Sequence, residues 1–363
     1  MKMEISKVIF SYEDLRNGLD LGRDDYGIAA LCTTSMKTAF LNNPNLIDYS
    51  QPFLYLGRVD GIAGGICMWF PTRLKAGEEF VSAESGSTLE VYEEFRKNAF
   101  GIDILQFPIT SGKFHFLIYA GISEQALKIY KKMRFSIFEF PRSMQLRNAR
   151  PLLESRGLNG VFSLSASIII NSLTKCWYKL SNLFNPSYNE YKVVKCHIIP
   201  EWVDDIVLND GHKYMEVHDR NWLQWNLDHN FYNEKYDKQS FYSVYFQEKP
   251  IAFFMTKERF RSLAGGVLKN VVIGSIMEWG VAGSSQMTET DLYKMATKTF
   301  SKSVDIIEFA TTDKRVIKQM KFNGFIPYSY AHIAIKDLTR KYKDAQDMNL
   351  WRLRLGYADV FLT

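Results

Sequence analysis

The chain repeats one succession of sequence patterns, and this repetition restricts the folds that it can adopt. Residues 114–120 form an apolar run that predicts a buried strand, and residues 123–135 carry apolar positions at helical spacing. In the second half, residues 305–310 again predict a strand and residues 313–325 a helix of the same spacing. The sequence therefore predicts a degenerate internal duplication, with two copies of one fold.

A predicted β-hairpin precedes the strand and helix in each half. Residues 53–74 read as two strands joined at Asp60-Gly61, and residues 241–260 as two strands joined around residues 248–250. In the second half a strand over 271–281 and a helix over 288–300 follow the hairpin. This order predicts an α/β fold in which each half is a mixed, mainly antiparallel sheet flanked by helices.

Length and composition agree with two domains. A chain of 363 residues with 46% hydrophobic residues can bury two cores of ordinary size. We predict an N-terminal domain over residues 1–157, a linker helix over 158–186 and a C-terminal domain over 187–363.

Charge and cysteine content restrict the partners. The net charge of +5 is mild, and Lys and Arg are scattered along the chain, so we expect no nucleic acid partner. The cysteines lie far apart without zinc-type spacing, so we expect free thiols and no metal. No signal peptide or membrane span is apparent, and we predict a cytoplasmic protein. The cysteines are Cys32, Cys67, Cys176 and Cys196.

Residues 160–186 carry no charge except Lys175 and Lys179. This stretch fits one long helix that either packs between two domains or lies at a membrane interface. Interfacial helices usually have a basic face, which is almost missing here, so we favour the inter-domain position.

The helix over 123–135 carries a recognisable motif. Ala126, Tyr130 and Phe135 match the pattern Asn-x-x-Ala-x-x-x-Tyr-x-x-x-Gly-Phe, while Ser123 stands in the place of Asn and Arg134 in the place of Gly. The helix resembles the acyl-CoA-binding helix of the Gcn5-related N-acetyltransferases. The resemblance implies that Tyr130 protonates the departing thiolate of coenzyme A. The alternative is that Tyr130 is a core residue of an amphipathic helix.

The same family places a cofactor loop of the form Arg/Gln-x-x-Gly-x-Gly/Ala before its first central helix. Arg96, Ala99 and Gly101 occupy these positions, so the resemblance implies that residues 96–101 receive the pyrophosphate of acetyl-CoA on backbone N–H groups. Ala99 replaces the first glycine, and its methyl group could crowd the loop. The helix that follows should be short, because Pro108 comes soon after. The implied cofactor-binding residues are Leu89, Val91, Arg96, Lys97, Asn98, Ala99, Phe100, Gly101 and Ser123.

The resemblance also implies where the reaction would occur. In this family a strand amide holds the oxyanion of the thioester carbonyl, and the backbone over 89–91 is the candidate. Glu90 on this strand is the candidate base, although an exposed strand carboxylate is more often part of the surface. Glu278, in the matching strand of the second half, is a weaker candidate.

The second copy lacks these groups. Met320 stands at the position of Tyr130 and cannot donate a proton, and residues 282–287 contain no Arg-x-x-Gly-x-Gly. We therefore assign coenzyme binding to the first half and expect the second half to shape the acceptor site.

The predicted activity is transfer of an acetyl or other acyl group from acyl-CoA to a small-molecule amine. An amino sugar or a cell-envelope precursor is one possible acceptor, suggested by resemblance to bacterial tandem proteins of this family. A second reading is a peptidyltransferase that uses aminoacyl-tRNA in cell-wall synthesis, although no coiled-coil arm or strongly basic face is visible. A third is a catalytically inactive binding or assembly module, which the departures at Ala99, Ser123 and Arg134 favour.

Overall fold

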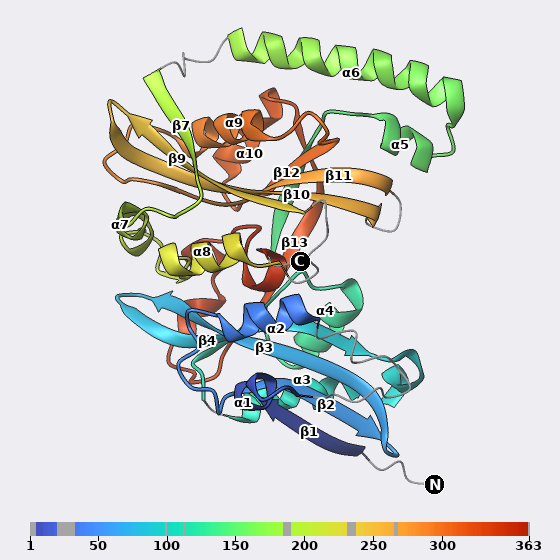
Figure 1. Ribbon diagram of the computed structural model, residues 1–363, viewed down its shortest axis with the longest axis vertical. Coiled ribbons are helices and arrows are strands. Elements are labelled where there is room, and N and C mark those ends of the chain that lie inside the picture. The colour runs from blue at the N-terminus through green and yellow to red at the C-terminus, as the bar shows by residue number, and fades with distance from the viewer. Residues whose placement is uncertain are drawn as a thin grey trace.

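The computed structural model describes residues 5–19, 33–98, 100–111, 113–183, 190–230, 237–264 and 268–361. The first half contains, in order, β1 (Ile5–Ser11), α1 (Tyr12–Arg16), α2 (Thr34–Leu41), β2 (Pro52–Val59), β3 (Ile62–Ala76), β4 (Glu79–Val91), η2 (Glu93–Asn98), α3 (Phe100–Ser111), β5 (Phe116–Ala120), α4 (Glu124–Lys132) and β6 (Ser136–Leu146). Two helices, α5 (Arg150–Ser155) and α6 (Gly160–Leu183), lead out of it (Figure 1).

The second half repeats this order. It contains β7 (Tyr191–Cys196), α7 (Trp202–Leu208), β8 (Tyr214–Glu216), α8 (Arg220–Asp228), β9 (Lys238–Phe246), β10 (Lys249–Ala264), β11 (Leu268–Val281), α9 (Glu289–Thr299), β12 (Ile306–Ala310), α10 (Lys314–Phe322) and β13 (Phe325–Asp337). Three 3-10 turns follow in the C-terminal tail, namely η4 (Lys343–Gln346), η5 (Met348–Leu350) and η6 (Ala358–Phe361). Apart from η2 in the first half and the short β8 in the second, the elements of the two halves correspond one to one, which confirms the predicted fold class.

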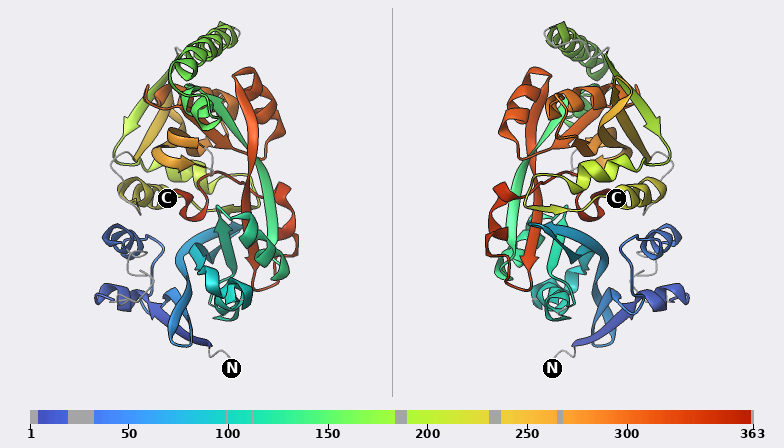
Figure 2. Two further views of the ribbon diagram at one scale, coloured as in Figure 1. Left: turned by 90° about the vertical axis from the view of Figure 1, so that its right-hand side faces the viewer. Right: turned by 90° about the vertical axis from the view of Figure 1, so that its left-hand side faces the viewer.

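The sheets of the two halves join into one. The strand order is β1-β2-β3-β4-β5-β13-β6-β12-β11-β10-β9-β7, with β8 paired to β3. Only β4 with β5 and β11 with β12 are parallel pairs on this path, and the others are antiparallel. We call β1–β5 with α1–α4 the N-terminal lobe, and β7 and β9–β12 with α7–α10 the C-terminal lobe (Figure 2).

The two lobes exchange their last strands. β13, at the end of the second half, pairs with β5 of the first, from Ile333 opposite Ala120 to Asp337 opposite Phe116. β6, at the end of the first half, pairs with β12, from Ile306 opposite Leu146 to Ala310 opposite Arg142. β6 and β13 also pair with each other along most of their length, so each lobe is completed by a strand from the other half of the sequence.

Helices cover both faces of each lobe. In the N-terminal lobe α3 and α4 pack on one face through Phe100, Ile104 and Tyr130. The opposite face packs against α1 and α2 in a large core that also includes α7, α8 and the C-terminal tail. The C-terminal lobe has its own core beneath α9 and α10. The two lobes therefore share one core and each keep a second one.

Local signals form the turns and caps that the sequence predicts. Asp60 and Gly61 both have positive φ, 49° and 81°, as a two-residue hairpin turn between β2 and β3 requires. Ser123 caps α4 by accepting a hydrogen bond from the Ala126 N–H, and Thr288 forms a capping box with Asp291 at the start of α9.

One local prediction was wrong. Pro108 does not shorten α3, which runs for 12 residues and continues past the proline to Ser111. A proline removes one hydrogen bond of the preceding turn, and burial of Phe100, Ile104 and Leu105 beneath the helix compensates for this loss. The candidate oxyanion backbone, residues 89–91, lies on a strand as expected; it is the end of β4, which begins at Glu79 and pairs with β3 on either side of one register shift.

Helix α6 forms over Gly160–Leu183 as predicted, but it does not pack between the lobes. It lies along the outer end of the molecule beyond α5 and the C-terminal lobe (Figures 1 and 2). None of the described helices combines the length and apolarity that crossing a bilayer requires.

Candidate coenzyme site

The parallel strands β4 and β5 separate beyond a short paired segment. They pair only from Ala83 opposite Phe116 to Gly86 opposite Tyr119, after which β4 continues to Val91 while β5 ends at Ala120. A β-bulge marks the point of separation, because the register of β4 against β3 shifts there and Thr88 has a φ of 51°. The result is a gap in the sheet that opens toward the start of α4.

Two cavities occupy this gap, each of about 330 Å³. Leu89, Ser123 and Ala126 line both of them, so the cavities are neighbours along the start of α4. The first, which we call the inner cavity, is also lined by Gly86, Ser87, Thr88, Tyr119, Ala120, Gly121, Ile122, Tyr130 and Val360. The second, the outer cavity, is also lined by Glu90, Val91, Arg96, Gly101, Gln125 and Ile129.

The two residues predicted to be catalytic lie in different cavities. Tyr130 lines the inner cavity and is 2% exposed, with its ring 4.9 Å from that of Tyr119 and 5.1 Å from that of Phe135. Glu90 is exposed and lines the outer cavity, beside Arg96. The geometry thus brings Tyr130 to one end of the gap and Glu90 to the other.

The predicted cofactor loop lies at the outer cavity. The Arg96 side chain is held by a 2.9 Å hydrogen bond from its Nε to the carbonyl of Val91, and Gly101 sits in the first turn of α3. The Phe100 side chain points away from this cavity into the core, because it packs on Gly57 and Gly64 of the hairpin. Ala99 lies outside the described residues, as do the side chains of Lys97 and Asn98.

Tyr119 is the second phenol of the inner cavity. Its oxygen accepts a 3.0 Å hydrogen bond from Trp69 Nε1, and burial raises its pKa well above the usual value. Gly86 gives this ring its space, since a Cβ there would lie 1.7 Å from the Tyr119 ring. The paired end of the gap is therefore closed by a fixed aromatic side chain.

The equivalent position in the C-terminal lobe is filled. β11 and β12 pair only from Ile273 opposite Ile306 to Ser275 opposite Glu308, and β11 then continues to Val281. Beyond that point Trp279, Tyr293, Phe309 and Phe325 form a chain of ring contacts at 4.9, 4.5 and 5.1 Å. The divergence of the strands is repeated, but aromatic side chains occupy the space.

Comparison with known proteins supports this description of the fold. No protein-family model and no curated protein sequence matches the chain. A GCN5-related N-acetyltransferase from Anabaena variabilis is similar in structure, with a TM-score of 0.55 and 7% identity over 93% of this chain and 73% of that one. The chain has the GCN5-related N-acetyltransferase fold.

Two further solved structures have this acetyltransferase fold over a similar extent. Saccharomyces cerevisiae N-myristoyltransferase with bound myristoyl-CoA matches with a TM-score of 0.56 and 12% identity, over 92% of this chain and 82% of that one. A probable N-acyltransferase of unknown function from Enterococcus faecalis matches with a TM-score of 0.55 and 12% identity, over 93% and 73%. At such low identity the similarity establishes only the fold of both lobes. Any chemistry must be argued from the residues that line the gap.

A third cavity, of about 210 Å³, adjoins the inner cavity. The two share Ala120, Gly121, Ile122 and Val360 as lining residues. Three guanidinium groups, those of Arg142, Arg259 and Arg354, also line the third cavity, together with His332. We call it the arginine cavity.

Two of the arginines of the arginine cavity share one carboxylate, so positive charge exceeds negative charge in this cluster. Arg142 and Arg259 both pair with the same carboxylate, Glu308, at 2.6 and 3.1 Å. Burial alone would raise the pKa of Glu308, but the two cations and its hydrogen bonds lower it to about 2. The Nε atoms of all three arginines are buried, and no described residue accepts a hydrogen bond from them.

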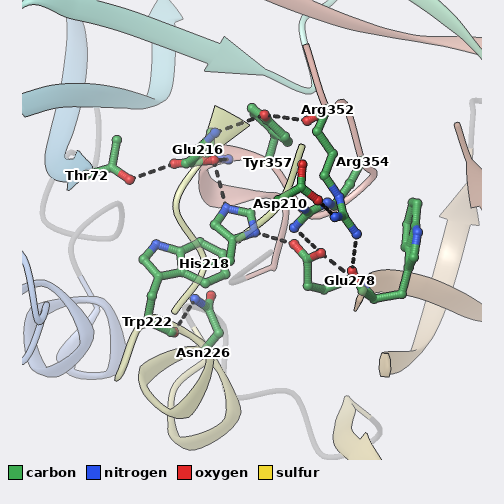
Figure 3. A network of polar contacts seen from close by, with 12 residues as sticks. Thr72, Asp210, Glu216, His218, Trp222, Asn226, Glu278, Arg352, Arg354 and Tyr357 are labelled. Atoms are coloured by element: carbon green, nitrogen blue, oxygen red, sulfur yellow. Dashed lines mark hydrogen bonds and ion pairs between the residues drawn. The ribbon is translucent and has the colours of Figure 1, made fainter. Parts of the chain in front are cut away.

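A buried ionic network joins the two lobes (Figure 3). His218 lies between two carboxylates: its Nδ1 contacts Glu278 on β11, and its Nε2 lies 3.1 Å from Glu216 on β8. Glu278 also pairs with Arg354 of the C-terminal tail. The His218 ring stacks on Trp222 at 3.6 Å. His218 and both carboxylates are fully buried, so Glu278 is a structural group here, and a role as base receives no support.

The network reaches the N-terminal lobe through Glu216. Its Oε1 accepts hydrogen bonds from Thr72 on β3 and Ser85 on β4, at 2.9 and 3.1 Å, and its Oε2 accepts one from the Ala358 N–H. Burial alone would raise the pKa of Glu216, but the hydrogen bond and charge of His218 together with these donors lower it. Glu216 is therefore ionised.

Sequence reasoning missed most of these groups. Glu216 lies in a three-residue strand, and Arg354 lies in a tail without regular structure, so neither belongs to a recognisable motif. Trp222 and Trp225, which lie on one side of α8, are core residues with exposures of 0% and 3%. His212, His218 and His229 are scattered through an aromatic-rich segment and form no recognisable motif, so the sequence gives no sign of the network.

The network predicts a pH-dependent stability. Burial alone would lower the pKa of His218, but Glu278 and Glu216 outweigh it and raise the pKa above 6.5. The stabilisation from charged His218 is complete below pH 6.5 and is lost as the pH rises through the raised pKa. His218→Phe should reduce the free energy of unfolding by about 3 to 5 kcal/mol at pH 6, because two buried carboxylates lose their cation.

The measurement is urea unfolding followed by circular dichroism at pH 6 and pH 9. The difference in the free energy of unfolding between wild type and His218→Phe should be smaller at pH 9 than at pH 6. The exposed His197→Phe is the matched control and should change stability by less than about 0.5 kcal/mol at either pH. An equal difference at both pH values would contradict the charged state that we assign to His218.

Proposed function

We propose that the N-terminal lobe binds acyl-CoA in the gap between β4 and β5 and transfers the acyl group to an amine. The observation that carries the proposal is the contrast between the lobes: the gap of the first contains two adjoining cavities, and that of the second contains aromatic rings in tilted contact. The residues that line an unfilled gap in a sheet lack the van der Waals contacts of a packed core. A bound ligand would supply these contacts.

The arrangement of the lining residues suits an extended thioester. At the outer cavity, Arg96 and the first turn of α3 offer a cation and helix N–H groups to the pyrophosphate. The pantetheine arm would pass Leu89, Val91 and Ser123, where the unpaired edge of β4 offers backbone amides. The thioester would then lie in the inner cavity beside Tyr130.

Tyr130 suits the role of general acid. As the tetrahedral intermediate collapses, the carbon–sulfur bond breaks and the thiolate takes a proton from the phenol. The amine must attack as the neutral base, and the oxyanion can accept a hydrogen bond from an N–H of the 89–91 backbone. Glu90 lines the outer cavity and Tyr130 the inner one, so this proposal assigns removal of the amine proton to water and not to Glu90.

The arginine cavity supports an acceptor that carries an anionic group. It adjoins the inner cavity at the acyl end, and three arginines line it, two of which share the single carboxylate of Glu308. Guanidinium groups bind carboxylates and phosphates through paired hydrogen bonds. An amine with a carboxylate or phosphate could place its anion there while its nitrogen reaches the thioester. The yeast N-myristoyltransferase with its bound myristoyl-CoA makes longer acyl groups a further possibility for the donor.

Coenzyme binding is tested by thermal unfolding with increasing coenzyme A, acetyl-CoA or myristoyl-CoA. Acetyl-CoA at 100 times its dissociation constant should stabilise the protein by about 2.7 kcal/mol. Ala126→Phe should abolish this shift, because Ala126 lines both cavities, whereas Lys128→Phe adds the same ring to an exposed position of α4 and should keep it. If none of the three coenzymes stabilises the wild type against thermal unfolding, the proposed function is refuted.

The role of Tyr130 is tested by Tyr130→Phe. Loss of a general acid should lower kcat by about 100-fold or more while coenzyme affinity stays within a factor of about two. Release of free thiol from acyl-CoA measures the rate. Tyr293→Phe, which alters a buried tyrosine of the filled gap in the C-terminal lobe, is the control and should retain full kcat. Unchanged kcat in Tyr130→Phe would exclude Tyr130 as the acid.

The acceptor class is tested by comparing amines that differ in one charged group. We expect kcat/KM for an amino acid or an amino-sugar phosphate to exceed that for its amide or its unphosphorylated form by about tenfold or more, which corresponds to about 1.4 kcal/mol. Arg142→Gln should reduce this preference and leave the thermal shift with acetyl-CoA intact. Equal rates for charged and neutral acceptors would refute the anionic acceptor without affecting the coenzyme site.

A further inference from the structure

Helix α6 presents its polar side to the protein and its apolar side to solvent. The inward contacts are polar: Tyr178 donates a 3.0 Å hydrogen bond to the Leu146 carbonyl, and Asn171 accepts one of 2.9 Å from the Ala149 N–H. Ser163 and Ser167 on the same side are buried. This is the reverse of the usual amphipathic helix, whose apolar side faces the core.

The outward side of α6 is a continuous apolar stripe. Its members span about 29 Å at 1.5 Å per residue, and their exposed fractions range from 46% to 80%. We call them the α6 stripe; they are Val161, Phe162, Leu164, Ile168, Ile169, Leu173, Trp177 and Leu180. Phe322 at the end of α10 is 65% exposed and adjoins the stripe, since Trp177 Nε1 donates to its carbonyl at 3.1 Å. Apolar patches of this length on a protein surface mark interaction sites.

Basic side chains also gather on the inward side of α6. A cavity of about 890 Å³ lies between α6, α9 and the loop before β12. Asp305 is the only carboxylate among its lining residues, and its two oxygens accept hydrogen bonds from Asn148 and the Val272 N–H. The cations that line it are Arg147, Lys175, Lys294, Lys298 and Lys302.

These lysines come from elements far apart in the sequence. α6 contributes Lys175, α9 contributes Lys294 and Lys298, and the loop contributes Lys302. α6 itself contains no acidic residue. The neighbouring lobe therefore adds cations behind the two exposed lysines of α6 itself, Lys175 and Lys179.

We propose that the α6 stripe docks onto an anionic lipid bilayer. The helix lies along the outer end of the molecule, where a flat surface can approach its whole length (Figures 1 and 2). The stripe would enter the boundary between headgroups and acyl chains, with Trp177 at the depth that tryptophan prefers. Lys175 and Lys179, which are exposed on α6, and the lysines of the cavity behind the helix would attract anionic headgroups, which adds to the affinity.

Charge favours a membrane over a second copy of the chain. In a symmetric dimer through α6, Lys175 and Lys179 of both copies would gather at one interface without any acidic residue on the helix to offset them. An anionic bilayer supplies the opposite charge along the whole face. This proposal does not depend on the coenzyme site.

The test is flotation of the full chain with vesicles of phosphatidylcholine, with and without about 30% phosphatidylglycerol, an anionic fraction sufficient for electrostatic attraction. We expect binding to the anionic vesicles at least about tenfold tighter than to the neutral ones, weakened by added salt. Trp177 fluorescence should shift to shorter wavelength on binding.

Two variants test separately the contributions of the apolar stripe and of the lysines to membrane binding. F162S/I169S/L173S and K294E/K298E/K302E should each reduce binding to anionic vesicles by at least about tenfold. Ile198→Ser, which removes an isolated apolar side chain that is 82% exposed, is the control and should bind as the wild type does. Thermal unfolding confirms that each variant is folded.

Two results would overturn the proposal. One is equal or absent binding of the wild type to neutral and anionic vesicles. The other is a dimer in light scattering that F162S/I169S/L173S converts to a monomer while vesicle binding stays unchanged. The second result would assign the α6 stripe to a second copy of the chain.

Discussion

The insertion of β13 between β5 and β6 is the constraint on which the rest of the structure depends. Its N-terminal part forms a ladder with β6 and its C-terminal part pairs with β5, so the sheet is continuous from one lobe to the other. Because backbone hydrogen bonds of a buried strand must be satisfied, neither lobe can complete its sheet without the other half of the chain. The exchange also directs the C-terminal tail back over the N-terminal lobe, where Trp351 enters the shared core and Val360 reaches the inner and arginine cavities.

The duplication is symmetric in backbone and asymmetric in side chains. Both lobes have a parallel strand pair that separates after a few residues, and both have a helix at the separation. In the N-terminal lobe Gly86 lets Tyr119 lie flat at the closed end, and the gap stays open beyond it. In the C-terminal lobe Trp279 and Tyr293 fill the gap and contribute to a core. Packed side chains stabilise a lobe and an unfilled gap does not, so the N-terminal lobe forgoes packing that the C-terminal lobe has.

Local features of this fold are readable from the sequence, and distant pairings are not. The caps at Ser123 and Thr288 and the turn at Asp60-Gly61 depend on residues within three or four positions, and these predictions hold. The exchange of β6 and β13 depends on pairings across about 200 residues, and no local pattern encodes it. The same is true of the network, in which His218 meets Glu278 sixty positions away. The candidate site is intermediate: the helix motif identified Tyr130, but the arginine cavity is formed by strands that only the exchange brings together.

In helix α6, hydrogen bonding and burial favour opposite orientations: hydrogen bonds turn the polar side toward the protein, and the apolar side stays exposed. The segment beneath it exposes backbone groups at Leu146, Ala149 and Phe322 that need hydrogen-bond partners, and Asn171, Trp177 and Tyr178 supply them. Those contacts fix the orientation of the helix without burying its aliphatic side chains. Because hydrophobic burial is the main source of helix stability in proteins, the α6 stripe contributes little to the folding of the isolated chain. Apolar side chains retained at such positions gain their free energy only when another apolar phase covers them.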